Sequence, residues 1–244
     1  MATNHTCISF TDSAGRDFKI IKTKASNIKL VNLGTPQKIR DTSYYGMNAS
    51  FFNTTPVNGK YKILNIAYQD GVNVGSGVDS EDGRRNSVGT ALIYWNGTSL
   101  LYADNVVFDS SSYVPKTSGS WAQGGIGLFL CNTLWETFYK DQLTSQQISD
   151  LDGGSARTGV LINTNTKDVY LIMSRILTTT VFDLRRAMME YAGLSEGGSS
   201  GYWKGILLDG GRSAQLRGET IDYTVLSPLV ARGVPQIIAL KNNN

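Results

Sequence analysis

The sequence predicts a mixed α/β (α+β) fold, with antiparallel-rich mixed sheets flanked by helices. The chain of 244 residues holds 26 glycines but only 5 prolines, which favours strands joined by tight turns over a helical bundle. Its 41% of hydrophobic residues can build a sizeable core. No internal repeat or proline-rich linker divides it. We therefore expect one domain over residues 1–244, with residues 1–15 irregular and residues 242–244 frayed.

Short apolar or alternating runs between Gly, Asn, Asp and Ser predict the strands. In chain order these runs cover residues 17–22, 60–68, 90–95, 127–131, 158–163, 168–174, 205–208 and 234–241. Asn96 and Gly97 lie between two such runs and are typical of a two-residue hairpin turn.

Three segments have helical spacing. Residues 134–142 place apolar side chains on one face, and residues 144–147 fit a capping box that would open a short helix through Leu151. Residues 180–192 have the clearest helical pattern, with an apolar face and Gly193 at the C-terminal stop.

Composition and charge argue against several classes of function. The net charge is +3 and the basic residues are scattered, so we expect no DNA or RNA binding. No stretch approaches the roughly 18 apolar residues of a membrane helix. The first residues also lack the pattern of a signal peptide. These features predict a soluble protein that is cytoplasmic or virus-associated, unless a leader has been removed; the oligomeric state stays open.

Histidine and cysteine are too scarce for much of the usual catalytic chemistry. The lone histidine, His5, is in a polar N-terminal segment that we expect to be mobile. Ser-His-Asp, Cys-His and histidine-zinc sites are therefore not expected, and we predict neither a metal nor a cofactor. Cys7 and Cys131 are interpreted as buried thiols, although a disulfide between them stays open.

The most suggestive polar segment follows the apolar run 205–208. It reads Asp209, Gly210, Gly211, Arg212, Ser213. The strand would aim the carboxylate, while the two glycine amides and the serine would form an anion-binding concavity. A plain turn is the alternative. The similar residues 151–155 (Leu-Asp-Gly-Gly-Ser) follow a polar segment instead of an apolar strand, so we interpret them as a loop without a site role.

Three further positions carry polar groups suited to a sugar phosphate. Asn48 stands among small residues before Phe51 and Phe52, where an amide could bind hydroxyls and an aromatic face could bind a sugar ring. A buried strand with a satisfied asparagine is the alternative. Arg157 and Arg232 each stand just before an apolar run, where a guanidinium could clamp a phosphate. Surface ion pairing is the alternative there.

Taken in order, these segments resemble the phosphodiester glycosidase family, the N-acetylglucosamine-1-phosphodiester alpha-N-acetylglucosaminidase-like domains. The resemblance spans roughly residues 40–240, and its motifs fall at residues 48–52, 124–128, 157–158, 209–213 and 232–234. It departs from the family at Ala49 and Ser50, which replace a glycine pair, at Gly127, which replaces a proline, and at Arg212, which replaces a glycine. Arg212 would narrow the pocket or add a phosphate contact.

The resemblance implies a metal-independent hydrolase that cleaves a sugar-1-phosphodiester between the anomeric carbon and the phosphate. Asp209, Arg157 and Asn48 are the expected catalytic residues. Expected binding residues for the small anionic substrate are Thr158, Gly210, Gly211, Arg212, Ser213, Arg232, Phe52 and Gly125. Asp209 would be nucleophile, base or oxocarbenium stabiliser, and a second carboxylate could come from residues 79–82.

Three other functions compete with this one. The chain could be an ordinary glycosidase acting on polysaccharide or glycolipid. It could also be a cytosolic or virus-encoded protein that binds or cleaves a nucleotide or sugar-phosphate signal. A purely structural role predicts no defined pocket.

Overall fold

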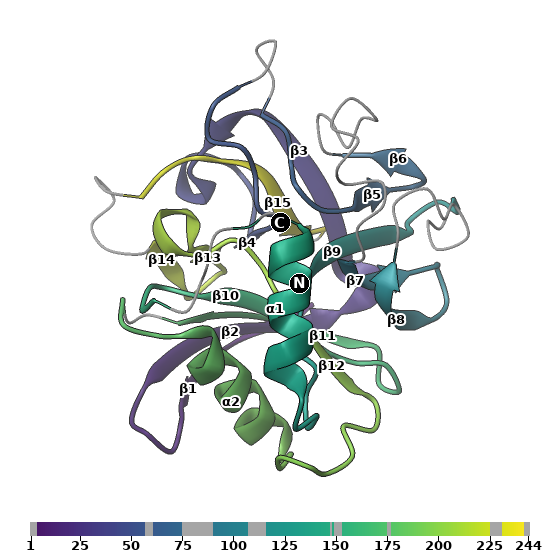
Figure 1. Ribbon diagram of the computed structural model, residues 1–244. Helices are drawn as coiled ribbons and strands as arrows, with labels where there is room; N and C mark the ends of the chain where they lie inside the picture. Colours follow the sequence, from purple (N-terminus) through teal and green to yellow (C-terminus); the bar gives the residue numbers. More distant parts are fainter. Residues whose placement is uncertain are drawn as a thin grey trace.

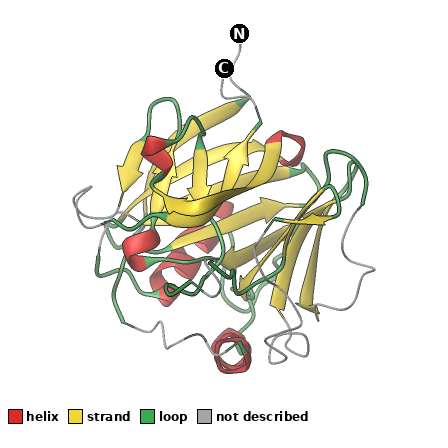
Figure 2. Cartoon of the chain, turned by 90° about the horizontal axis from the view of Figure 1, so that it is seen from above, coloured by secondary structure: helices red, strands yellow, loops and turns green. Residues whose placement is uncertain are grey.

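The computed structural model describes residues 4–56, 61–74, 90–106, 116–146, 148, 153–174, 177–224 and 231–241. Two antiparallel sheets and two α-helices make up this part of the chain, which confirms the mixed α+β fold class and shows that strands dominate it (Figures 1 and 2).

The larger sheet has ten strands and a branched order. Its main path is β1(His5–Thr11), β2(Asp17–Lys24), β11(Asp168–Ser174), β10(Thr158–Asn163), β12(Trp203–Leu207), β9(Trp121–Gly127), β5(Ala67–Gln69) and β6(Val72–Asn73). The hairpin of β7(Thr90–Trp95) and β8(Leu100–Val106) branches off at β9. Trp95 pairs with Leu100, so the hairpin predicted at Asn96-Gly97 is confirmed, but its loop has four residues, 96–99, instead of two.

The smaller sheet runs in the order β14(Asp222–Thr224), β13(Gln215–Arg217), β4(Gly46–Asn48), β15(Val234–Leu240) and β3(Ile28–Gln37). The last strand of the chain, β15, therefore lies between two early strands. Short 3-10 turns at Ala25–Asn27, Ile39–Asp41 and Gly211–Ser213 connect elements of the two sheets.

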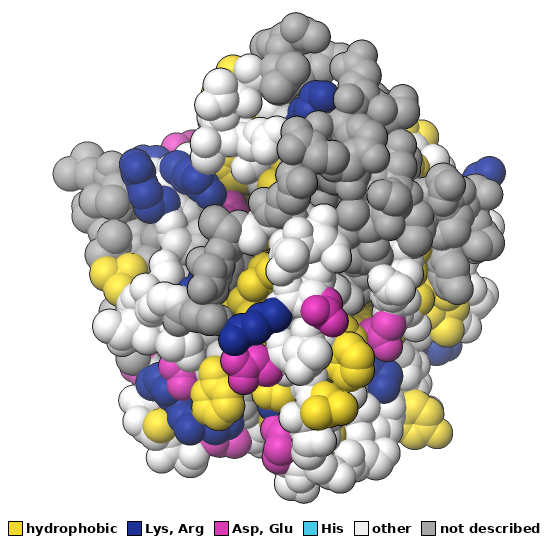
Figure 3. All heavy atoms as spheres, viewed as in Figure 1, with side chains coloured by type: hydrophobic (Ala, Val, Ile, Leu, Met, Phe, Trp, Pro, Cys, Tyr) yellow, Lys and Arg dark blue, Asp and Glu magenta, His cyan; other side chains and the backbone are white. Residues whose placement is uncertain are grey.

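The helices α1(Trp135–Ser145) and α2(Val181–Ala192) cover the larger sheet on the side away from the smaller one (Figure 1). Thr180 caps α2 through a capping box with Asp183, and Gly193 ends it in the left-handed conformation with φ of 69°. The prediction for this helix is confirmed. Apolar side chains also reach the helical surface, where Phe182 is 51% exposed and Figure 3 shows apolar and charged groups interspersed.

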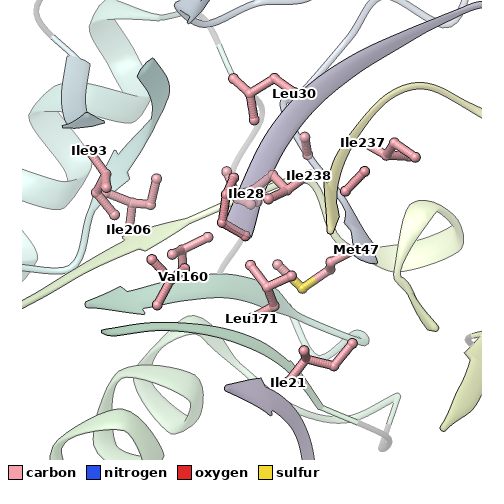
Figure 4. Close-up of a cluster of buried hydrophobic side chains, with 14 of the residues drawn as sticks. Ile21, Ile28, Leu30, Met47, Ile93, Val160, Leu171, Ile206, Ile237 and Ile238 are labelled. Atoms are coloured by element: carbon pink, nitrogen blue, oxygen red, sulfur yellow. The ribbon is translucent and has the colours of Figure 1, made fainter. Parts of the chain in front are cut away.

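Alternation along the strands divides the core into two main clusters. Ile21, Val160 and Ile206 face the smaller sheet, where they meet Met47 and Ile238 (Figure 4). The adjacent residues in the same strands face the helices: Ile20, Leu161 and Leu207. Since successive strand residues point to opposite faces, these continuous apolar runs reflect a sheet buried on both sides.

Two predicted strands differ from the structure. Within residues 60–68, a single bridge from Ile63 to Phe52 precedes β5, which begins only at Ala67. The predicted strand at residues 127–131 is wrong because β9 ends at Gly127. Phe129 and Cys131 then have φ of 42° and 65°, which turn the chain out of the sheet.

The ends of two other predicted segments also need correction. Residues 5–11 are not irregular, because β1 pairs with β2 along its whole length and His5 is buried, 8% exposed, with its ring edge-on to Tyr45. The helix predicted to start at Thr144 does not start there, since Thr144 and Ser145 form the last turn of α1. Most of its remaining residues, up to Leu151, lie outside the described part of the chain.

Cys7 and Cys131 are free thiols that belong to different core clusters, so they form no disulfide in this structure. Among the described residues, no helix is both long and apolar enough to cross a membrane.

Candidate functional site

A cavity of about 500 Å³ opens where several separate chain segments meet. Most of its wall comes from the stretch after β4, the turn before β10 and the turn after β12, with Arg232 from just before β15 and single residues from two further segments. The lining residues are Phe51, Phe52, Thr54, Leu64, Ile148, Gly153, Gly154, Ser155, Arg157, Asp209, Gly210, Gly211, Arg212 and Arg232. Apolar side chains and guanidinium groups thus both line the cavity.

Asp209 follows β12 directly, and its residue is only 8% exposed. Its main-chain N–H donates to the carbonyl of Ala49 at 3.2 Å, which holds the end of β12 against the residue after β4. The carboxylate oxygen Oδ2 accepts a hydrogen bond from Arg232 Nη2 at 2.9 Å. The strand therefore delivers one buried carboxylate to the cavity wall, already paired with a cation.

Arg232 is held on three sides. Its Nε donates to Ser213 Oγ at 2.5 Å, its Nη2 donates to Asp209, and its guanidinium lies 4.7 Å from the centroid of the Phe52 ring. The side chain is still 32% exposed. Such a cation can meet an anion in the cavity without first having to be ordered.

Arg157 lies deeper, with 4% of its surface exposed. Its Nε donates to the carbonyl of Thr179 at 3.3 Å, and its Nη2 donates to the carbonyl of Gly153. Arg212 is exposed and lies in the turn Gly211–Ser213 at the cavity wall. Among the described lining residues, three guanidinium groups therefore face a single carboxylate, and the cavity favours an anionic ligand.

Two opposing effects set the pKa of Asp209. Burial raises the pKa of the carboxyl group above its usual range, because the charged form is desolvated. The charge of Arg232 and the hydrogen bonds from Ser213, Arg232 and the Gly210 amide lower it again, without cancelling the effect of burial. A carboxylate with this balance responds strongly to the loss of its cation.

Two main-chain N–H groups of the predicted anion-binding concavity donate to other parts of the protein instead of to the cavity. The N–H of Gly211 donates to the carbonyl of Ala156 at 2.8 Å, and the N–H of Ser213 donates to the carbonyl of Gly210 at 3.1 Å. Ser213 itself is fully buried and is absent from the cavity wall. These amides close the turn, so the arginines are the described groups that present positive charge to the cavity.

Gly210 is required by a close backbone approach. A Cβ atom at this position would lie 2.6 Å from the carbonyl oxygen of Ala156. We expect Gly210→Ala to lower the free energy of unfolding by about 1–3 kcal/mol, because the turn must move to relieve the clash. Urea denaturation measures this. Gly153→Ala is the control, since its Cβ meets no atom within 4 Å; equal stabilities of the two variants would contradict the expectation.

Three other predicted site residues lie behind the cavity wall. Asn48 and Thr158 are both 0% exposed, and both donate to the main-chain oxygen of Asp209 at 2.6 Å. Gly125 is in β9, where a Cβ would lie 2.6 Å from the carbonyl of Leu207. The expected direct contact of these residues with a substrate does not fit their burial; Asn48 and Thr158 touch Asp209 instead.

Several lining residues were not predicted from the sequence. Gly153, Gly154 and Ser155 belong to the segment interpreted as a loop without a site role, yet they line the cavity. Their signal was the nearby Arg157, whose side chain folds back onto Gly153. Leu64 and Ile148 could not be predicted from the sequence, because only the fold brings them to the cavity.

The acidic residues 79–82 and Asp152 lie outside the described residues. No cluster of three or more potential metal ligands occurs in the described part.

Comparisons with known proteins support the fold alone. No family model and no curated protein matches the sequence. Among solved structures, the chain is similar to the catalytic domain of zebrafish N-acetylglucosamine-1-phosphodiester alpha-N-acetylglucosaminidase, auto-inhibited by its pro-peptide. The TM-score is 0.60 at 13% identity, over 97% of this chain and 82% of that one. A hypothetical protein from Synechocystis matches with a TM-score of 0.48 at 13% identity, over 96% of this chain and 61% of that one.

Proposed function

We propose that the protein is a hydrolase that cleaves sugar-1-phosphodiesters between the anomeric carbon and the phosphate. One observation carries this proposal: Asp209 shares a single cavity with three arginines and two phenylalanines. The likeness of the fold to a phosphodiester glycosidase domain supports it, although a fold by itself does not define a function.

The arginine side chains that line the cavity suit the phosphate group of such a substrate. A phosphodiester carries one negative charge, and the monoester that leaves carries more, so positive charge nearby stabilises the transition state more than the ground state. Arg232 is the best placed group, because Ser213 and Phe52 hold its guanidinium while part of it stays exposed. Arg157 and Arg212 add positive charge to the same wall.

The apolar side chains that line the cavity suit the sugar ring. Phe51, Phe52 and Leu64 line it, and the Phe52 ring also packs edge-on against Tyr61 at 6.4 Å. Binding pockets for small molecules commonly combine such apolar walls with a few fixed polar groups. A sugar on these walls would have its anomeric carbon close to Asp209, with its phosphate close to the arginines.

In the proposed reaction the bond between the anomeric carbon and the phosphate oxygen breaks, and the phosphate monoester takes the electron pair. Water supplies a hydroxyl to the anomeric carbon and releases one proton. Ionised Asp209 either accepts that proton or stabilises the positive charge on the sugar, directly or as a nucleophile. Each of these roles needs the carboxylate form. Because the phosphate leaves readily, a second carboxyl group acting as an acid is less necessary than in an ordinary glycosidase.

The pH profile follows from the balance at Asp209. We expect kcat/KM to fall as pH drops through the pKa of Asp209, and this acid limb should lie above the usual range of an aspartate. In Arg232→Gln the limb should move to higher pH, because the cation that lowers this pKa is gone. Arg40→Gln removes the same charge outside the cavity and should leave the limb in place. An acid limb that stays fixed in Arg232→Gln would argue against Asp209 as its source.

The reaction is tested with a panel of sugar-1-phosphodiesters in ¹⁸O-labelled water. Attack at phosphorus places the label in the phosphate monoester, whereas cleavage at the anomeric carbon leaves the phosphate unlabelled. Turnover with an unlabelled phosphate monoester supports the proposal, and label in the phosphate or no turnover contradicts it. Equal turnover of glycosides without phosphate would point to an ordinary glycosidase. Tight binding of a sugar phosphate or nucleotide without turnover would point to a binding protein.

A further inference from the structure

Two buried donors converge on the main-chain oxygen of Asp209. Asn48 Nδ2 and Thr158 Oγ1 each donate to it at 2.6 Å. Asn48 Nδ2 also lies 3.3 Å from Thr158 Oγ1, and Asn48 Oδ1 accepts from the Gln215 N–H at 3.0 Å. Both hydrogens and the oxygen of the Asn48 amide are thus used inside the protein, which leaves little capacity for a substrate.

These hydrogen bonds cross the boundary between the two sheets. Asn48 ends β4 of the smaller sheet, while Thr158 begins β10 of the larger one. Met47, directly before Asn48, packs with Val160 and Ile206 in the cluster between the sheets (Figure 4). The main chain at Asp209 is therefore fixed by both sheets at once: by Ala49 at its N–H and by Asn48 and Thr158 at its carbonyl.

We infer that Asn48 and Thr158 are positioning residues, which fix the main chain of Asp209 so that its carboxylate points at Arg232 and into the cavity. The inference rests on the proposed function and adds residues that do not touch the substrate. Backbone fixed on both sides of Cα leaves the side-chain torsions as the main freedom of Asp209, and Arg232 restricts those. Misplacement of a reactive group by about 1 Å can cost about 100-fold in rate.

Thr158→Val tests this with little change of shape, because valine keeps the branched side chain and removes only the hydroxyl. We expect kcat to fall about tenfold or more, because the Asp209 carboxylate is no longer held in its orientation. KM should be nearly unchanged, because the residues that line the cavity stay in place. Thr158→Ser keeps the hydroxyl and should recover most of kcat. Thr164→Val is the matched control: its hydroxyl donates to the Tyr202 carbonyl at 3.3 Å at an exposed position.

A second measurement keeps the inference separate from the proposed function. The ¹³C signal of the Asp209 carboxyl group reports its titration without any substrate. In Thr158→Val we expect its pKa to rise, because a carboxylate that turns away from Arg232 loses the cation that lowers it. Thr158→Ser should titrate like the wild type.

Two results would overturn the positioning role of Thr158. A folded Thr158→Val protein with unchanged kcat and unchanged Asp209 titration would overturn the inference. So would equal losses of kcat and melting temperature in Thr158→Val and Thr158→Ser, since these would show a structural role alone. If the wild type cleaves no sugar-1-phosphodiester, the proposed function fails, and the titration still decides the positioning role.

Discussion

Replacing Asp209 by asparagine should lower turnover of a sugar-1-phosphodiester by about 100-fold or more, because no charge remains to assist the anomeric centre. Asparagine has the same shape, so contacts at the main chain of residue 209 with Ala49, Asn48 and Thr158 stay in place. Steady-state kinetics with a sugar-1-phosphodiester measures the loss of turnover. Asp222→Asn, at an ion pair of the smaller sheet, should retain full turnover. Substantial activity in Asp209→Asn would remove this residue from the reaction.

The same variant should not be less stable than the wild type at neutral pH. Burial raises the pKa of Asp209, so the folded state holds the ionised form at a cost that asparagine does not have. The stability that this carboxyl group contributes is present at low pH and is lost as pH rises through its folded pKa. The two proteins should therefore become equally stable as pH falls and Asp209 is protonated. Urea denaturation at several pH values measures both trends.

Replacing Arg185 by methionine should lower the free energy of unfolding by about 2–4 kcal/mol, because main-chain acceptors in the turn after β9 lose their charged donor. Arg185 is 2% exposed, and its guanidinium donates to the carbonyls of Leu128 at 2.9 Å and of Phe129 and Asn132 at 3.2 Å. It also pairs with Glu196 at 2.6 Å. Methionine fills the space of the stem but leaves these buried acceptors without a donor.

Arg186→Met is the matched control for Arg185. It is the next residue of α2, it is 37% exposed, and its contacts with acidic groups are 3.6 Å or longer. Exposed pairs of this kind contribute about 0–1 kcal/mol. Chemical denaturation of both variants, with the wild type alongside, measures the difference. If Arg185→Met lowers the free energy of unfolding no more than Arg186→Met does, the turn after β9 does not need the Arg185 guanidinium for its stability.

Local signals predicted most of the fold that positions the site. Strands β10 and β11 follow apolar runs with polar ends, and α2 carries both its cap and its stop in the sequence. The turn at residues 128–131 could not be predicted, because its shape depends on Arg185, which is more than 50 residues away along the chain. The polar strand β1 was missed because its pairing with β2 decides its structure, and its own pattern is weak.

The candidate site divides in the same way. Asp209, Arg157, Arg212 and Arg232 were selected from their places at the ends of strands, and the structure brings them into one cavity; their roles stay predictions. The orientation of Asn48 was not predictable, since it is set by Gln215 and Asp209 from distant segments. The sequence cannot show that the Gly211 amide is used inside the protein, because its partner is the carbonyl of Ala156, more than 50 residues away along the chain.

The central place of β15 in the smaller sheet bears on how the protein folds. During synthesis β3 and β4 emerge early, but the strand that joins them is made only after more than 180 further residues. Arg232 lies two residues before that strand, so the positive charge beside Asp209 also arrives late. Folds dominated by such non-local pairing form slowly, over about milliseconds to seconds. Removal of residues 234–240 would leave two unpaired strand edges, and such edges promote aggregation.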